Sequence, residues 1–256
     1  MPKATIGLLF LLLLGASCQP LGIGNPQATP VGPEVGLGPE LPVSETADDI
    51  GLKSTVPESS VPSPAPKPPE HTIRVLKVPF TSQAPSADWD MPYQEACEEA
   101  SMIMVAEYLQ GIERISIPAE EADTLILGLV GWETDHGYAV DLTAQEVVKV
   151  LAERYGIQAE AVPYSAEVIR EELQAKRPVI VPAAGRLLGN PYFTSPGPLY
   201  HMLVIKGYEG NEFITNDPGT KRGESYRYTE SALAYAVHDW NEGEVESGAQ
   251  VMIVVR

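Results

Sequence analysis

Cys97 lies in the larger, C-terminal part of this 256-residue chain, and two residues further along could turn its thiol into a nucleophile. A thiolate attacks a carbonyl carbon well, but it needs a base to take the thiol proton and a third group to orient that base. His201 and Asp217 are residues of these two types. They predict acyl-transfer chemistry, with Cys97 as the nucleophile, His201 as its base and Asp217 as the residue that orients the histidine.

A helix is predicted to begin at Cys97, because the apolar residues that follow recur at helical spacing and would form one buried stripe. These residues are Met102, Val105, Ala106 and Leu109, and Gly111 ends the pattern. The unpaired N–H groups and partial positive charge at the start of a helix stabilise a thiolate. Glu98 and Glu99 act in the opposite direction on the thiol. A nearby imidazolium would help to overcome them.

Four histidines compete for the role of base, and for each of them a purely structural role stays open. His71 lies at the start of the folded region, and His238 belongs to a late helix, so both are expected to be surface or packing residues. His136, in an Asp-His-Gly loop, is a rival. His201 is preferred because it lies in a predicted strand, residues 199–208, where alternation fixes the face that its side chain takes.

The orienting residue follows a second predicted strand, residues 212–216. A turn at residues 209–211 lays that strand beside the His201 strand, and a carboxylate at its end can hold one ring nitrogen while the other faces the thiol. Asn216 is the alternative to Asp217. Successive strand residues point to opposite faces, so only one of the two can serve.

Four stretches of the chain together resemble a known family: Val78-Pro79-Phe80-Thr81-Ser82-Gln83, Cys97-Glu98-Glu99-Ala100-Ser101, His201 with its strand-forming neighbours, and Asn216-Asp217-Pro218-Gly219. Over residues 73–256 the chain resembles the bacteriocin-processing, double-glycine peptidase-like cysteine peptidases of the papain-like superfamily. The resemblance implies the same three roles and adds Gln83 as the donor to the oxyanion, with Gln94 as the rival donor. Glu98 and Glu99 depart from the glycine and small residue that follow the cysteine in many relatives.

The remaining patterns predict an α+β domain over residues 71–256, with a helical first half and an antiparallel sheet afterwards. The resemblance implies that this domain has a papain-like fold, in which the nucleophile lies at a helix start packed on the sheet. Further strands are predicted at 73–78, 179–182, 225–228 and 251–255, and helices at 118–129, 143–156 and 166–175. A late helix capped by Thr229 is expected to bury Leu233, Ala236, Val237 and Trp240. Residues 191–198, before His201, either line the groove or simply connect two elements.

The N-terminal region predicts export. Residues 1–17 form a signal peptide, since Lys3 precedes an apolar run, residues 6–14, that is too short to span a bilayer. Cys18 follows in a segment that resembles a lipobox, which predicts lipidation and anchoring to the outer face of the cytoplasmic membrane; a cleaved signal and a secreted protein are the alternative. Cys97 is then an unpaired thiol in an oxidising compartment, which favours a functional role.

Residues 18–70 are predicted to be a disordered linker, because residues 19–70 hold 12 of the 24 prolines and no aromatic residue. The net charge of −18 excludes nucleic acid and anionic membrane surfaces as partners, which leaves a lipid anchor as the expected membrane contact. We expect a monomer without a cofactor. A zinc site at Cys97, His136 and His201 is a weak alternative, because these residues lack close ligand spacing.

The leading hypothesis is therefore an exported thiol hydrolase that cleaves peptide or related amide bonds through an acyl-enzyme. Glu98 and Glu99 favour a second hypothesis, a catalytically inactive module that holds a peptide or a cell-wall fragment on the same fold. A cell-wall amidase or an acyl transferase with the same three residues is the third, because these residue types do not choose between water and an amine as acceptor.

Overall fold

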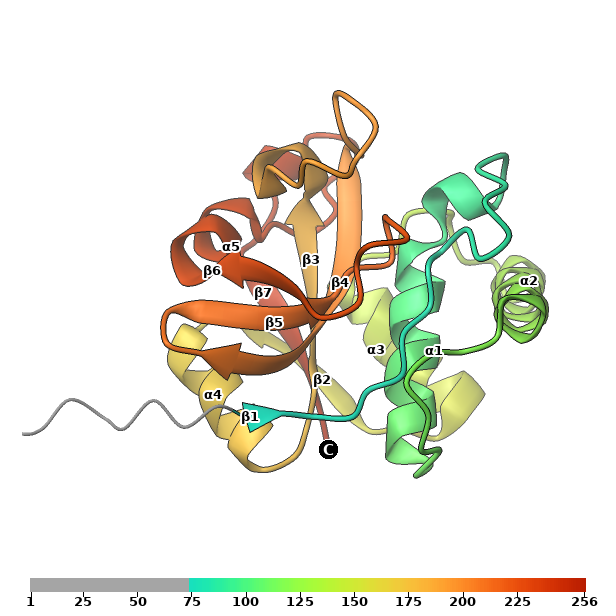
Figure 1. Ribbon diagram of the computed structural model, residues 1–256. Coiled ribbons are helices and arrows are strands. Elements are labelled where there is room, and N and C mark those ends of the chain that lie inside the picture. The colour runs from blue at the N-terminus through green and yellow to red at the C-terminus, as the bar shows by residue number, and fades with distance from the viewer. Residues whose placement is uncertain (1–73) are drawn as a thin grey trace, which may run out of the picture. The chain divides into compact units, whose positions relative to one another are not determined.

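The computed structural model describes residues 74–256 (Figure 1). The predicted signal peptide, the predicted linker, Cys18 and His71 lie outside the described residues. Among the helices of the described part, none has the length and apolar character that crossing a membrane requires. The domain limits predicted from the sequence stay predictions.

The first half of the described chain is helical, with a short 3-10 turn, Tyr93–Glu95, followed by α1 (Cys97–Leu109), α2 (Ala119–Asp135) and α3 (Ala144–Tyr155). Helix α1 packs against β4 of the sheet and against α2 and α3, and α2 lies on the side of α1 away from the sheet (Figure 1). It is buried on every face from Cys97 to Glu107, whereas Leu109 is 37% exposed. The prediction of a single buried stripe ending at Leu109 is therefore wrong, because a helix enclosed on all sides needs no polar face.

One antiparallel sheet forms the second half, in the order β2-β7-β3-β4-β5-β6, with β1 paired to β4 beside this path. Its strands are β1 (Arg74–Val75), β2 (Ala159–Pro163), β3 (Val179–Ala184), β4 (Tyr200–Glu209), β5 (Glu212–Asn216), β6 (Tyr226–Thr229) and β7 (Val251–Val255). The first strand is shorter than the predicted 73–78, and β2 was not predicted, because its short sequence has no clear alternation. The predicted α+β architecture is confirmed.

Local signals placed the later helices correctly. Thr143 and Glu146 form the capping box of α3, and Thr229 caps α5 (Glu230–Ala236) through a 3.2 Å bond from the Ala232 N–H. Helix α4 (Ala166–Gln174) buries the two residues expected to face inward, Ile169 and Leu173. Two helix limits differ from the predictions, because α2 continues to Asp135 and α5 ends before Val237 and Trp240. Val237 is nevertheless buried, and the Trp240 ring lies 5.4 Å from the Tyr200 ring.

The β4–β5 hairpin matters most for the site, because it carries His201 on one strand and ends at Asp217 after the other. Its turn is Gly210-Asn211, one residue shorter than the predicted 209–211 because Glu209 belongs to β4, with a positive φ of 61° at Gly210 that glycine adopts readily. The side chain of Asn216 donates to the carbonyl oxygens of Val78 and Pro79, at 3.1 and 3.0 Å. Asn216 therefore anchors the segment that leads to Gln83 and does not face His201.

Candidate functional site

His201 and Asp217 form a buried pair, with the Nε2 atom of the histidine 2.8 Å from the Oδ1 atom of the carboxylate. Their exposed fractions are 1% and 0%. Burial by itself raises the pKa of Asp217, but the neighbouring His201 and hydrogen bonds from His201, Tyr228 and Gly219 outweigh it and hold this pKa below its usual value. An ionised carboxylate only accepts hydrogen bonds, so the pair keeps a proton on Nε2 and leaves Nδ1 for another partner.

The other carboxylate oxygen of Asp217 is held by two residues that the sequence did not point to. Asn190 donates its side-chain N–H at 3.0 Å, and the hydroxyl of Tyr228 donates at 2.6 Å. The backbone N–H of Gly219 donates to Oδ1 at 3.0 Å. Asn190 lies 27 residues before Asp217 in a loop and Tyr228 lies on β6, so no local motif could have linked them to the site. Together they fix the carboxylate against rotation.

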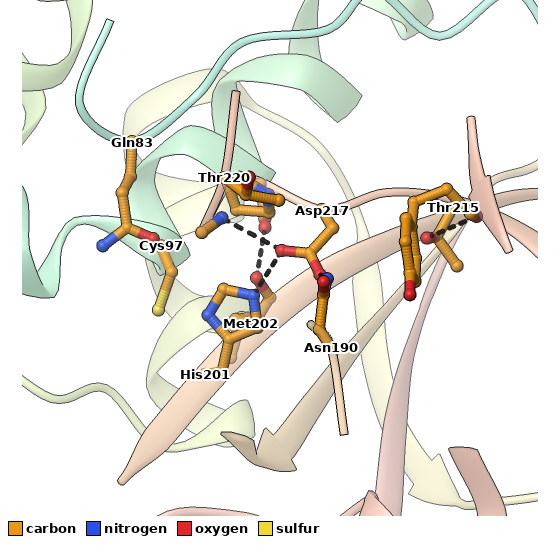
Figure 2. A network of polar contacts seen from close by, with 12 residues as sticks. Gln83, Cys97, Asn190, His201, Met202, Thr215, Asp217 and Thr220 are labelled. Carbon is orange, nitrogen blue, oxygen red and sulfur yellow. Dashed lines mark hydrogen bonds and ion pairs between the residues drawn. The ribbon is translucent and has the colours of Figure 1, made fainter. Parts of the chain in front are cut away.

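Cys97 begins α1, and its sulfur lies on the side of the His201 ring away from Asp217 (Figure 2). The backbone of Met202, the residue after His201, contacts the thiol and opposes only in part the stronger effects that raise its pKa. The N-cap residue, Ala96, supplies no side-chain hydrogen bond to the helix start. The carboxyls of Glu98 and Glu99 contact their own backbone N–H groups, so the N–H of Cys97 is the helix-start group expected to donate to an oxyanion.

Glu98 holds the thiol in the structure. The Cys97 sulfur donates to the Oε2 atom of Glu98 at 2.9 Å, and the other oxygen of Glu98 accepts the backbone N–H of Leu142 at 3.2 Å. Burial, then the charge and hydrogen bond of Glu98, and then the charge of Glu99 raise the pKa of the Cys97 thiol well above its ordinary value. Burial is thus the largest cause of the raised pKa, and the two glutamates act on the thiol in the direction expected from the sequence.

Two further carboxyls, those of Glu99 and Glu133, form a buried pair with each other. Glu99 on α1 and Glu133 on α2 are each 4% exposed. Burial and the charge of Glu133 raise the pKa of Glu99, and burial is also the main cause that raises the pKa of Glu133 to about 7. Neutral carboxyls can lie this close together in an apolar interior, whereas two charged ones would repel each other.

Replacing Glu98 with glutamine should lower the pKa of the Cys97 thiol, because the substitution removes the carboxyl whose charge and hydrogen bond raise that pKa. A thiol with a lower pKa is ionised over a wider pH range, so its rate of alkylation should rise at lower pH than in the unchanged protein. The measurement is the rate of iodoacetamide labelling between pH 5 and 10. A profile that stays at the same pH in Glu98→Gln would contradict the assigned role of Glu98.

Gln83 lies in the site with its amide turned away from the proposed oxyanion position. Its side-chain N–H groups donate to the carbonyl oxygens of Tyr93 and Gln94, both at 2.9 Å, and its own side-chain oxygen is buried without a partner. Donation to an oxyanion therefore requires a rotation of the Gln83 side chain. Gln94 is exposed, and its amide donates to Glu95.

Separate replacement of Gln83 and Gln94 with alanine tests which amide acts on the oxyanion. Loss of one oxyanion donor costs about 10² to 10³ in kcat, so Gln83→Ala should lower kcat by about that factor while Gln94→Ala lowers it by less than about threefold. The measurement is kcat and KM on one cleaved peptide. Equal effects of the two substitutions would contradict the choice of Gln83.

A groove of about 800 Å³ opens beside the pair, lined by Gln83, Trp89, Gln94, Tyr192, Phe193, Thr194, Ser195, Pro196, Gly197, Pro198, Gly219, Thr220, Lys221 and Arg222. The loop at residues 191–198 thus forms one wall, so it lines the groove and is more than a connection. The Phe193 ring lies 5.2 Å from the His201 ring in an edge-to-face arrangement. A Cβ atom at Gly219 would lie 2.8 Å from both rings, so glycine is needed where the groove meets the imidazole.

The other candidate residues lie elsewhere. His136 stacks on Trp132 at 4.0 Å and bonds the carbonyl of that residue, and His238 bonds the carbonyl of Gly248. Within residues 74–256, no three His, Cys, Asp or Glu side chains come together in a way that could hold a metal ion. The structure therefore does not bring Cys97, His136 and His201 together as the zinc alternative required.

A family model described as the peptidase C39-like family matches residues 75–244. No curated protein matches the chain. Among solved structures, a C39-like peptidase from Bacillus anthracis is 17% identical, with a TM-score of 0.47 over 72% of this chain and 98% of the other. A double glycine motif protease from an AMS/PCAT transporter, in complex with the leader peptide, is 19% identical, with a TM-score of 0.40 over 71% and 93%.

Proposed function

The chain belongs to the peptidase C39-like family, a family of cysteine peptidases, and from this premise we propose that it is an exported thiol hydrolase that cleaves peptide or related amide bonds. The observation that carries the proposal is the buried His201–Asp217 pair beside Cys97, at the side of an open groove. A nucleophile, a base and a fixed orienting carboxylate are the groups that acyl transfer through a thioester needs.

The proposed reaction begins when Nδ1 of His201 takes the thiol proton and the Cys97 sulfur attacks the substrate carbonyl carbon. The resulting oxyanion is stabilised by the backbone N–H at the start of α1 and by Gln83 after its amide has turned. His201 then gives its proton to the leaving amine, which leaves an acyl group on Cys97. Water, activated by His201, hydrolyses this thioester and restores the free thiol.

Asp217 has two tasks in this proposal. It keeps the proton on Nε2 of His201, so that Nδ1 is free to accept from the thiol, and it stabilises the imidazolium that forms. The hydrogen bonds from Asn190, Tyr228 and Gly219 support both tasks, because they hold the carboxylate ionised and in place.

We also propose that the protein acts outside the cell, as a monomer held at the outer face of the cytoplasmic membrane by a lipid on Cys18. The support is the sequence of residues 1–17, with its charged start and apolar run, and the small residues directly before Cys18. A peptide or a cell-wall peptide is the expected substrate.

A peptide-library digest tests the proposed function. The full chain is incubated with a mixed peptide library, and the new termini are read by mass spectrometry. The same protein alkylated at Cys97 with iodoacetamide is the control. We expect cleavage at a limited set of sites by the free thiol and none by the alkylated protein. Equal cleavage by both proteins would overturn the proposal.

The contact between Glu98 and the thiol favours a second candidate function, a binding module that holds a peptide without cleaving it. A thiol with a raised pKa is mostly neutral near pH 7 and is therefore a poor nucleophile. In that case the library would be bound but not cut, and the Cys97 thiol would react with iodoacetamide only at alkaline pH.

A further inference from the structure

The charge of the groove is opposite to that of the chain. The protein carries a net charge of −18, yet the two charged residues that line the groove, Lys221 and Arg222, are both cations. Both side chains are exposed. Within residues 74–256, neither forms an ion pair with a carboxylate. Two unpaired cations at a concave surface attract anionic groups from solution.

The position of these cations relative to the catalytic pair is fixed by the loop that carries them. The loop begins at Asp217 and closes on itself, because the Asp217 N–H donates to the Gly223 carbonyl at 3.0 Å and the Gly223 N–H donates to the Thr220 carbonyl at 3.1 Å. Pro218 accepts the Gln83 N–H at 2.9 Å. The backbone that carries Lys221 and Arg222 is thereby held next to Asp217, the partner of His201.

Arg222 is further ordered by the opposite wall. Its guanidinium lies over the Tyr192 ring, 4.8 Å from the ring centre, and its backbone N–H donates to the Thr220 hydroxyl at 3.2 Å. A guanidinium stacked in this way keeps its edge N–H groups for a planar, bidentate partner, and a carboxylate has that geometry. The aromatic side chains of Trp89, Tyr192 and Phe193 supply apolar contact for the rest of a peptide.

We infer that Lys221 and Arg222 form a subsite for a substrate carboxylate, so that the protein selects peptides with an acidic group near the bond that is cut. This inference rests on the proposed function of the groove as the substrate site. The carboxylate belongs either to an Asp or Glu side chain or to the C-terminus of a short peptide. Both sources share the chemistry that the two cations recognise.

The first experiment measures specificity with a peptide that the library digest shows to be cleaved. Each position around the cut bond is replaced in turn by Glu, Gln or Lys, and kcat/KM is measured for every peptide. At one or more positions we expect Glu to be preferred over Gln by about tenfold, with a preference that weakens as salt is raised. A free C-terminus compared with an amidated one separates the two sources of the carboxylate.

The variant Lys221→Glu with Arg222→Glu then tests the assignment. It should prefer Lys over Glu at the same position, a gain that a merely disordered loop would not produce. Lys149→Glu is the matched control, because Lys149 is exposed on α3 outside the groove. Identical rates for Glu, Gln and Lys peptides would overturn the subsite and leave the proposed hydrolase standing.

A binding measurement separates this inference from the proposed function. The Cys97→Ala protein is immobilised and exposed to a peptide library in solution that carries Glu, Gln or Lys at each position. The peptides that the protein retains are then identified. We expect enrichment of Glu peptides that is reversed in the charge-reversed variant. If the unchanged protein cleaves no peptide in the library digest while the Cys97→Ala protein still enriches Glu peptides, the hydrolase proposal fails and the subsite stands. If Glu peptides are not enriched, the subsite is overturned.

Discussion

Replacing Cys97 with alanine is expected to reduce peptide cleavage by a factor on the order of 10⁵, because the substitution removes the atom that forms the thioester. The residual rate would come from binding and from the N–H groups at the start of α1, which remain in the variant. The measurement is kcat/KM on one peptide taken from the library digest. Active-site titration with iodoacetamide gives the concentration of reactive thiol in the unchanged protein.

Two comparisons make the Cys97 result specific. Cys97→Ser keeps the size of the side chain but offers a much weaker nucleophile, so it should also lose most of the activity. Thermal unfolding of both variants checks the fold, since Cys97 is 4% exposed and packs in the core. Folded Cys97→Ala protein that cleaves at the original rate would rule out Cys97 as the nucleophile.

Replacing Asp217 with asparagine is expected to lower kcat by a factor on the order of 10³ with little change in KM. An asparagine amide can donate its N–H group to Nε2 of His201. Nε2 is then a hydrogen-bond acceptor, so the neutral ring carries its proton on Nδ1 instead. A protonated Nδ1 cannot take the proton of the thiol. If the side chain turns the other way, its N–H group meets the donors Asn190 and Tyr228, which is also unfavourable.

The pH profile adds a second readout for Asp217. Because the pKa of this carboxyl lies below its usual value, Asp217 is ionised throughout the neutral pH range and adds no limb to the pH profile there. The Asp217→Asn variant should therefore be slow across the whole pH range. Asp135→Asn, at an exposed carboxylate near the end of α2, is the control. Recovery of the full rate at any pH would contradict the tautomer argument.

The sequence placed the local elements of the site because their signals lie within a few residues of one another. The capping box of Thr143 and Glu146, the Thr229 cap and the Gly210 turn each depend on neighbouring backbone groups, and all three are present as expected. Burial of α1 on all sides was not predictable in the same way. It depends on α2, α3 and β4 enclosing the helix, and no pattern within the helix reports its neighbours.

The choice between Asp217 and Asn216 shows where sequence reasoning stopped. Because side chains alternate in direction along a strand, only one of the two could face His201. Which of them does so depended on the side of the sheet on which residues 78–79 run. The structure places the Asn216 side chain against those backbone carbonyls and Asp217 against the histidine. The roles of the site residues stay predictions until they are measured.

The sequence by itself determined the kinds of group available for chemistry, their order along the chain and the elements that carry them, because residue types and short-range spacing decide these properties. Only the tertiary structure decided what surrounds the Cys97 thiol. Glu98 turns its carboxyl onto the sulfur because Leu142, 44 residues away, holds the other oxygen. The Asn190 and Tyr228 contacts to Asp217 and the Lys221–Arg222 wall of the groove likewise join distant segments. Such contacts arise from packing, and packing between distant segments leaves no periodic trace in the sequence.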